Sequence, residues 1–120
     1  MRDIKFRSWN VVDKTMYNSI YNCKDSFEMQ LKHPQIYKIM QYTGLKDVNG
    51  IEIYEGDIVE RRFMNLIDGA EFVGVVKYYD GAFNVDNNRE AYPLFHEIDE
   101  IEILGNIYED SGLLEGINND

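Results

Sequence analysis

Two histidines are the first residues to consider for chemistry, because imidazole serves both as a metal ligand and as a general base. His96 is followed by Glu97 and, after one more residue, by Asp99, so an imidazole and two carboxylates stand close together. A metal centre usually needs three or four ligands with supporting contacts behind them. This spacing is not diagnostic, and His33 stands apart, so we expect solvated histidines and no metal site.

Cys23 is the single cysteine of the sequence and therefore its one candidate thiol nucleophile. Lys24 is the nearest base, and no histidine follows at a spacing known for thiol enzymes. A lone cysteine is also often a small buried apolar residue. One cysteine excludes a disulfide within the chain and any metal site built from several thiolates.

Glu100 and Glu102 belong to an alternating segment, which places both carboxylates on the solvent face of a strand. A catalytic pair needs opposed positions across a cleft and one raised pKa. The segment from Asp47 to Gly50 lacks the spacing of a calcium loop, and the chain has neither a P-loop nor a dinucleotide-binding fingerprint. We therefore expect no catalytic residues, no cofactor and no metal, in a protein that is not an enzyme.

The charge of the chain is high and uneven. Its 120 residues include 22 acidic and 12 basic side chains, for a formal net charge of −10. This length suits one domain, and the charge argues against binding a phosphate backbone, which requires a clustered basic surface. Residues 1–40 carry seven basic and four acidic side chains, whereas residues 41–120 carry five and eighteen. The simplest interpretation is that a slightly basic N-terminal segment docks on an acidic body, in the same chain or in a neighbouring subunit.

Two other interpretations of the surface stay open. A small barrel binds nucleic acid when aromatic side chains stack on bases beside cations. The candidates are the aromatics Phe6, Trp9, Tyr78, Tyr79 and Phe83 and the cations Arg2, Lys5, Arg7, Arg61, Arg62 and Lys77, of which Arg2, Lys5 and Arg7 mark the most suitable face. Alternatively, the acidic residues near the C-terminus imitate DNA phosphates and inhibit a host DNA-binding protein. Nine acidic residues follow Arg89, and no Lys or Arg occurs among them.

The residue pattern predicts a mainly β chain with a small helical part. Asp25 or Ser26 caps a short helix that starts at Phe27, has Leu31 on the same face and ends before Pro34. Strands are predicted at Ile4–Trp9, around Lys14–Tyr17, at Ile36–Tyr42, Ile58–Phe63, Phe72–Tyr79 and Ala82–Val85, and in the region Ile98–Ile107 with a break at Gly105.

Three turns organise these strands. Asn49-Gly50 predicts a type I′ hairpin turn, because both residues tolerate positive φ, and Asp80-Gly81 predicts a second hairpin. Gly56-Asp57 predicts a turn in which the aspartate bonds the backbone of its own turn, as at the first strand of many SH3-like barrels. We expect an α+β fold that is mainly β, with a strand/helix unit at residues 1–35 and an SH3-like barrel at residues 36–120.

Nothing in the sequence indicates a membrane protein. No apolar run approaches the roughly 20 residues that a membrane helix requires. The first residues include Arg2 and Lys5 but no apolar segment of the kind found in secretory signals. These features and the lone cysteine agree with a cytoplasmic protein.

Several blocks of the sequence together are similar to one protein family. They are Ile4–Trp9, Met40–Gly50, Ile51–Val59, Gly74–Val76 with Asp80–Phe83, and Ile103–Glu109. This combination resembles the YopX-like proteins encoded by bacteriophages and prophages, over nearly the whole chain. The chain departs from the usual pattern at Asn10, where an acidic residue commonly follows the tryptophan, and residues 11–35 match no part of it.

The resemblance implies a small, mainly β protein of phage origin in the cytoplasm of a bacterial host. It carries over no catalytic residues, because the family has no established biochemical function. We therefore expect a non-enzymatic accessory protein that binds a host or phage protein, with a homo-oligomer as a further option. The nucleic-acid-binding barrel and the acidic DNA mimic are the alternatives.

Overall fold

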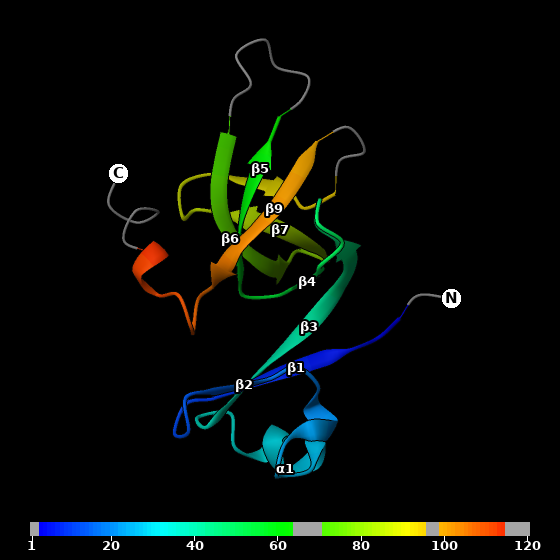
Figure 1. Cartoon of the computed structure of the whole chain (residues 1–120), viewed down its shortest axis with the longest axis vertical. Coiled ribbons are helices and arrows are strands. Elements are labelled where there is room, and N and C mark those ends of the chain that lie inside the picture. The colour runs from blue at the N-terminus through cyan, green and yellow to red at the C-terminus, as the bar shows by residue number, and fades with distance from the viewer. Residues whose placement is uncertain (1–2, 64–70, 96–98, 115–120) are drawn as a thin grey trace.

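Two antiparallel sheets follow one another along the longest axis of the molecule (Figure 1), and the mainly β architecture agrees with the prediction. The computed structural model describes residues 3–63, 71–95 and 99–114. Its helical elements are small: η1 (Ile20–Asn22), α1 (Phe27–Lys32) and a last turn at residues 112–114. The sheets therefore supply the framework of the protein.

The first sheet has four strands, of which β3 is the longest. Their order is β2 (Thr15–Tyr17), β1 (Phe6–Asn10), β3 (Tyr37–Lys46) and β4 (Glu52–Tyr54). The first half of β3 pairs with β1, from Tyr37 to Gln41, and its second half pairs with β4. The predicted boundary at residue 35 thus falls just before a strand that pairs with residues on both sides of it, and the division into 1–35 and 36–120 stays a prediction.

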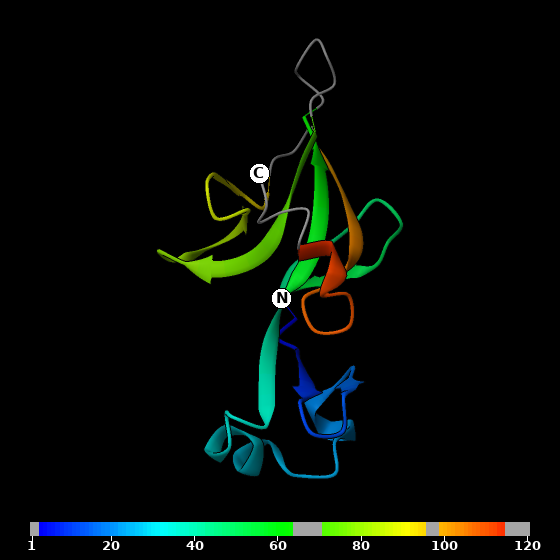
Figure 2. The ribbon, with the colours of Figure 1, turned by 90° about the vertical axis from the view of Figure 1, so that its left-hand side faces the viewer.

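The second sheet has five strands and curls into a half-barrel (Figure 2). Their order is β8 (Ala91–Pro93), β7 (Ala82–Asp86), β6 (Glu71–Tyr79), β5 (Asp57–Arg62) and β9 (Glu100–Asn106). Its core contains Val59, Phe72, Val76, Val85 and Leu94, together with Ile53 from β4. The β3–β4 hairpin therefore packs on the second sheet and contributes to its core.

The hairpin also covers the outer edge of β9. The backbone N–H of Val48 donates to the carbonyl of Ile101 at 2.9 Å. The N–H of Ile103 donates to Oδ2 of Asp47 at 3.0 Å. An exposed strand edge invites pairing with other chains, and these two bonds satisfy part of the β9 edge inside the molecule.

The two predicted hairpins differ in their turns. Asp80 and Gly81 have φ values of 53° and 80°, so that turn is of type I′. The prediction for Asn49-Gly50 was wrong in type, because Gly50 has a φ of 80° but Asn49 does not have a positive φ. Asp47 instead accepts the N–H of Gly50 at its carbonyl and the N–H of Asn49 and Ile51 at its Oδ1, which holds a wider turn.

The helix α1 is capped as predicted but buries a different residue. The Ser26 hydroxyl accepts the N–H of Met29, and the Phe27 ring stacks on Phe6 with centroids 5.7 Å apart. Leu31 is 58% exposed, whereas Gln30 is fully buried and donates to the carbonyls of Ile20 and Asp25. The amide of Gln30 thus ties α1 to η1, a role that apolar spacing does not reveal.

The last strand departs from regularity one residue before the predicted break. Ile58 pairs with Gly105 and Val59 with Ile103, so Leu104 is the extra residue of a bulge. Gly105 itself remains in β9. The short strand β8 and the helix η1 are elements that the residue pattern did not predict.

Candidate functional site

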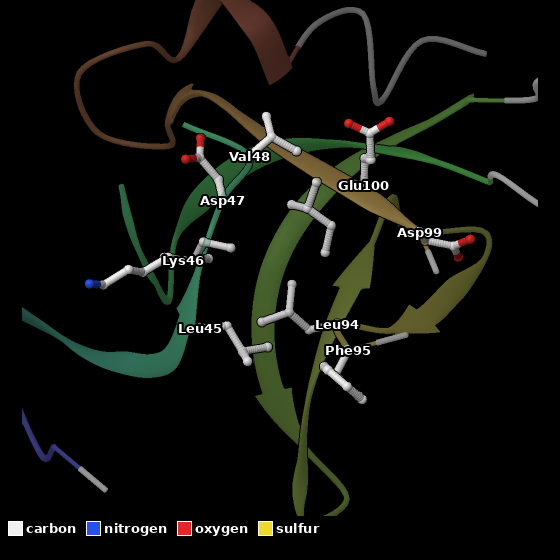
Figure 3. Close-up of a pocket in the computed structure, with 10 residues that line it drawn as sticks. Leu45, Lys46, Asp47, Val48, Leu94, Phe95, Asp99 and Glu100 are labelled. Carbon is white, nitrogen blue, oxygen red and sulfur yellow. The ribbon is translucent and has the colours of Figure 1, made fainter. Parts of the chain in front are cut away.

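A groove opens where the β3–β4 hairpin meets β8 and the start of β9 (Figure 3). Its volume is about 240 Å³. The lining comes from three segments that lie far apart in the sequence: Leu45–Val48 and Ile53, Leu94–Phe95, and Asp99–Ile101. The packing of the hairpin on the second sheet therefore creates this groove.

The floor of the groove is apolar and continuous with the core of the second sheet. Ile53 and Leu94 are 1% and 2% exposed and belong to the core of the second sheet. Leu45 and Ile101 pack against that core from β3 and β9. A small recess with an apolar floor is suited to receive an aliphatic or aromatic side chain.

Two large apolar side chains stand exposed at the rim. Phe95 is 64% exposed and Val48 is 46% exposed, and both line the groove (Figure 3). Exposed aromatics beside a preformed recess are typical of places where proteins contact one another.

Asp47 shapes the hairpin side of the groove, and its charge is satisfied by backbone donors. Burial by itself raises the pKa of this carboxyl group, but the N–H groups of Ile103, Ile51 and Asn49 outweigh burial and hold the pKa below 3.8. The carboxylate is therefore ionised at neutral pH.

Asp99, in the opposite wall, forms a buried ion pair with Arg61. Nε and Nη2 of Arg61 lie 2.9 and 2.7 Å from Oδ2 of Asp99, and both side chains are almost fully buried. Arg61 also donates to the carbonyl of Pro93 and lies over the rings of Phe63 and Tyr92. One guanidinium thus fixes the end of β8 relative to the start of β9.

Glu100 and Glu102 share a single cation. Nη2 of Arg62 bonds Oε1 of Glu102. Its Nε lies 3.1 Å from Oε1 of Glu60, and its Nη1 lies 3.9 Å from Oε2 of Glu100. Three carboxylates around one guanidinium form a charged surface cluster, and Ile101 and Ile103 pack inward as the alternation predicted.

The cations suggested for nucleic acid are engaged with acidic residues wherever the structure describes them. Nη2 of Arg7 lies 2.7 Å from Oδ1 of Asp57, and Nζ of Lys5 lies 2.6 Å from Oε2 of Glu52. These N-terminal cations therefore bond acidic residues of the segment 36–120 of the same chain. Lys77 lies 3.7 Å from Asp86. Arg61 and Arg62 pair as described above, and Arg2 lies outside the described residues.

The suggested stacking aromatics have partners within the protein. Trp9 stacks on Tyr108 with ring centroids 5.8 Å apart, and Phe6 stacks on Phe27. Tyr78 packs edge-on against Phe83, and these residues come from neighbouring strands. The Tyr79 hydroxyl donates to Asp86 at 2.8 Å.

The remaining candidates are scattered. His33 follows the last turn of α1, and Cys23 is partly buried beyond η1. His96 and Glu97 lie outside the described residues. In the part of the chain that the structure describes, no group of three or more His, Cys, Asp or Glu side chains is arranged to hold a metal ion. No helix among the same residues has the length and apolar character needed to cross a membrane.

The groove residues Val48, Leu94 and Phe95 were missed by the sequence analysis. The one available signal is the apolar pair Leu94-Phe95, which stands after Pro93 in a largely polar and acidic segment. Its partner segment, Leu45–Val48, lies more than 40 residues earlier in the sequence, so the recess appears only when the strands are assembled.

Two solved structures have a fold similar to that of this chain. Protein EF1440 from Enterococcus faecalis is 23% identical, with a TM-score of 0.57 over 96% of this chain and 100% of that chain. Protein yopX from Bacillus subtilis is 19% identical, with a TM-score of 0.63 over 97% of this chain and 98% of that chain. At identities this low, the structural similarity shows a shared fold and nothing further. A search of curated proteins found no match. The YopX protein family model matches residues 5–115, nearly the whole chain, and the chain therefore belongs to the YopX family.

Proposed function

We propose that the chain is a non-enzymatic accessory protein of a phage or prophage that binds another protein in the cytoplasm of a bacterial host. The observation that carries this proposal is the exposed Phe95 beside a preformed apolar recess. Exposed aromatic anchors next to desolvated pockets supply much of the binding energy in protein interfaces. Val48 extends the apolar rim on the facing hairpin, so a partner has contacts on both sides of the recess.

The charges of the chain support a protein partner over nucleic acid. Five of the six cations suggested for a phosphate-binding face are paired with carboxylates of the same chain. Binding to a phosphate backbone would require these cations to leave carboxylates that already neutralise them. The acidic DNA mimic stays a hypothesis, and a captured DNA-binding protein would support it.

Site-specific photo-crosslinking in host cells tests the proposal. A benzophenone side chain at position 95 is expected to give a discrete adduct with one partner protein. The same probe at Tyr21, which is 84% exposed in η1, serves as the control on a different surface. Val48→Glu places a charge on the rim of the recess and should abolish the adduct. Equal adducts from both positions, or none from position 95, would contradict the proposal.

A further inference from the structure

The ionisable groups around the groove carry an excess of negative charge. Among the residues that the structure describes, four line it: Lys46, Asp47, Asp99 and Glu100. Arg61 balances Asp99 in a buried pair. In Figure 3 the charged ends of Lys46, Asp47 and Glu100 all point away from the apolar centre of the recess, so these groups belong to its rim.

Within the described part of the chain, no cation pairs with the negative charge of Asp47. The bonds that its carboxylate accepts come from backbone N–H groups and the neutral Asn49 side chain, which stabilise the charge but do not cancel it. These donors also hold its pKa low, so Asp47 is ionised throughout the physiological range.

Glu100 adds a second negative charge to the rim of the groove. It lies 3.9 Å from Arg62, whose guanidinium is closer to Glu60 and bonds Glu102. One positive charge thus faces three negative charges, and the Glu100 side chain is 45% exposed. Counted over the described residues, these groups and the lining residues give five carboxylates (Asp47, Glu60, Asp99, Glu100 and Glu102) against three cations (Lys46, Arg61 and Arg62).

From the apolar recess and this negative rim we infer that the groove takes an aliphatic or aromatic side chain from a partner segment that carries lysine or arginine on either side. This inference rests on the proposed function and specifies the partner's chemistry. The recess supplies the desolvated contact, and the unbalanced carboxylates favour cations next to it while disfavouring acidic segments. A second copy of the chain is the alternative occupant, and its net charge of −10 opposes that association.

Three fluorescent octapeptides test the inference by anisotropy. Each has a central Leu-Phe pair, flanked on both sides by two lysines, two serines or two glutamates. The lysine peptide is expected to bind about tenfold more tightly than the glutamate peptide at low salt, and this difference should shrink as salt rises. Glu100→Lys should weaken binding of the lysine peptide about fivefold. Glu28→Lys makes the same charge change on the distant α1 and should have little effect.

The possible results separate the inference from the proposed function. Equal binding of the three peptides overturns the inference but supports a docking groove. No peptide binding together with a partner adduct from position 95 also overturns the inference while the proposed function stands. No peptide binding and no adduct overturn both. A dimer of the chain as the adduct in purified protein identifies a second copy as the occupant and overturns the inference.

Discussion

Arg7 and Asp57 join the two sheets through an ion pair that is almost removed from water. Nη2 of Arg7 lies 2.7 Å from Oδ1 of Asp57, and the two side chains are 11% and 3% exposed. The other carboxylate oxygen accepts the N–H of Tyr54 at 2.8 Å, so Asp57 bonds the backbone of its own turn as the sequence predicted. The same Arg7 lies over the Tyr54 ring. One aspartate therefore stabilises its turn and holds β1 against β5.

Removing the cation of this pair should destabilise the protein strongly. In Arg7→Met, the Asp57 carboxylate stays buried without its counter-charge, and we expect the free energy of unfolding to fall by about 3 kcal/mol. Urea denaturation followed by circular dichroism measures this loss. Lys5→Met is the matched control, because Lys5, just before β1, pairs with Glu52 of β4 in a position that is exposed to water and screened. Similar losses in both variants would show that burial of the Arg7 pair is unimportant.

The loss of unfolding free energy in Arg7→Met should also depend on pH. Burial raises the pKa of Asp57 above 3.8, and the nearby Arg7 charge partly offsets that rise. Without Arg7 the pKa rises further, so the folded variant takes up a proton more readily than its unfolded chain. Its deficit relative to the wild type is therefore largest at neutral pH and shrinks as pH falls through the raised pKa. A deficit that grows on acidification would contradict this account.

Asp47→Asn should lose stability with the same direction of pH dependence, but the change should fall in a more acidic range. The backbone donors bonded to Asp47 hold its folded-state pKa below 3.8, so its stabilising contribution is present above that value. We expect the variant to lose about 1–3 kcal/mol of unfolding free energy near neutral pH. The difference from the wild type should shrink only as pH falls below about 4, through the lowered pKa. Asp13→Asn, at an exposed turn, is the control. If the unfolding free energies of Asp47→Asn and the wild type differed by the same amount at every pH down to about 3, the prediction would be refuted.

Gly50→Val should destabilise the β3–β4 hairpin through the backbone alone. Gly50 has a φ of 80°, and a Cβ added there meets no atom within 4 Å. A β-branched residue resists this conformation, so we expect a loss of about 2 kcal/mol and a lower melting temperature. Gly50→Asn should lose much less, because asparagine tolerates positive φ. Equal melting temperatures for the wild type and the valine variant would show that the turn does not require this conformation.

Neighbouring substitutions at the groove should separate stability from binding. Leu94→Ala empties a buried position and should lose about 2–5 kcal/mol of unfolding free energy. Phe95→Ala removes a largely exposed ring and should change stability by about 0.5 kcal/mol or less. Phe95→Ala should nevertheless weaken binding of the lysine-flanked peptide, measured by anisotropy on the folded variant. Unchanged binding would remove Phe95 from the interface.

The sequence by itself determined the features that depend on a few adjacent residues. Ser26 caps its helix and Asp80-Gly81 makes a type I′ turn, because backbone dihedral preferences and nearby hydrogen bonds decide both. Alternation of apolar residues predicted most strands, since one face of each strand is more buried than the other. The same local logic assigned Asn49-Gly50 to a type I′ turn, but the Asp47 carboxylate selects a wider one.

Tertiary structure alone decided which distant residues share an environment. Asp47 reaches β9, Arg61 meets Asp99, and Gln30 rather than Leu31 is buried. The groove likewise requires Leu45 and Leu94 to face one another across two sheets. A residue's type and neighbours in sequence specify what it can bond. Burial specifies which of those bonds form, because a charge or amide removed from water must find its partner wherever the packed chain places one.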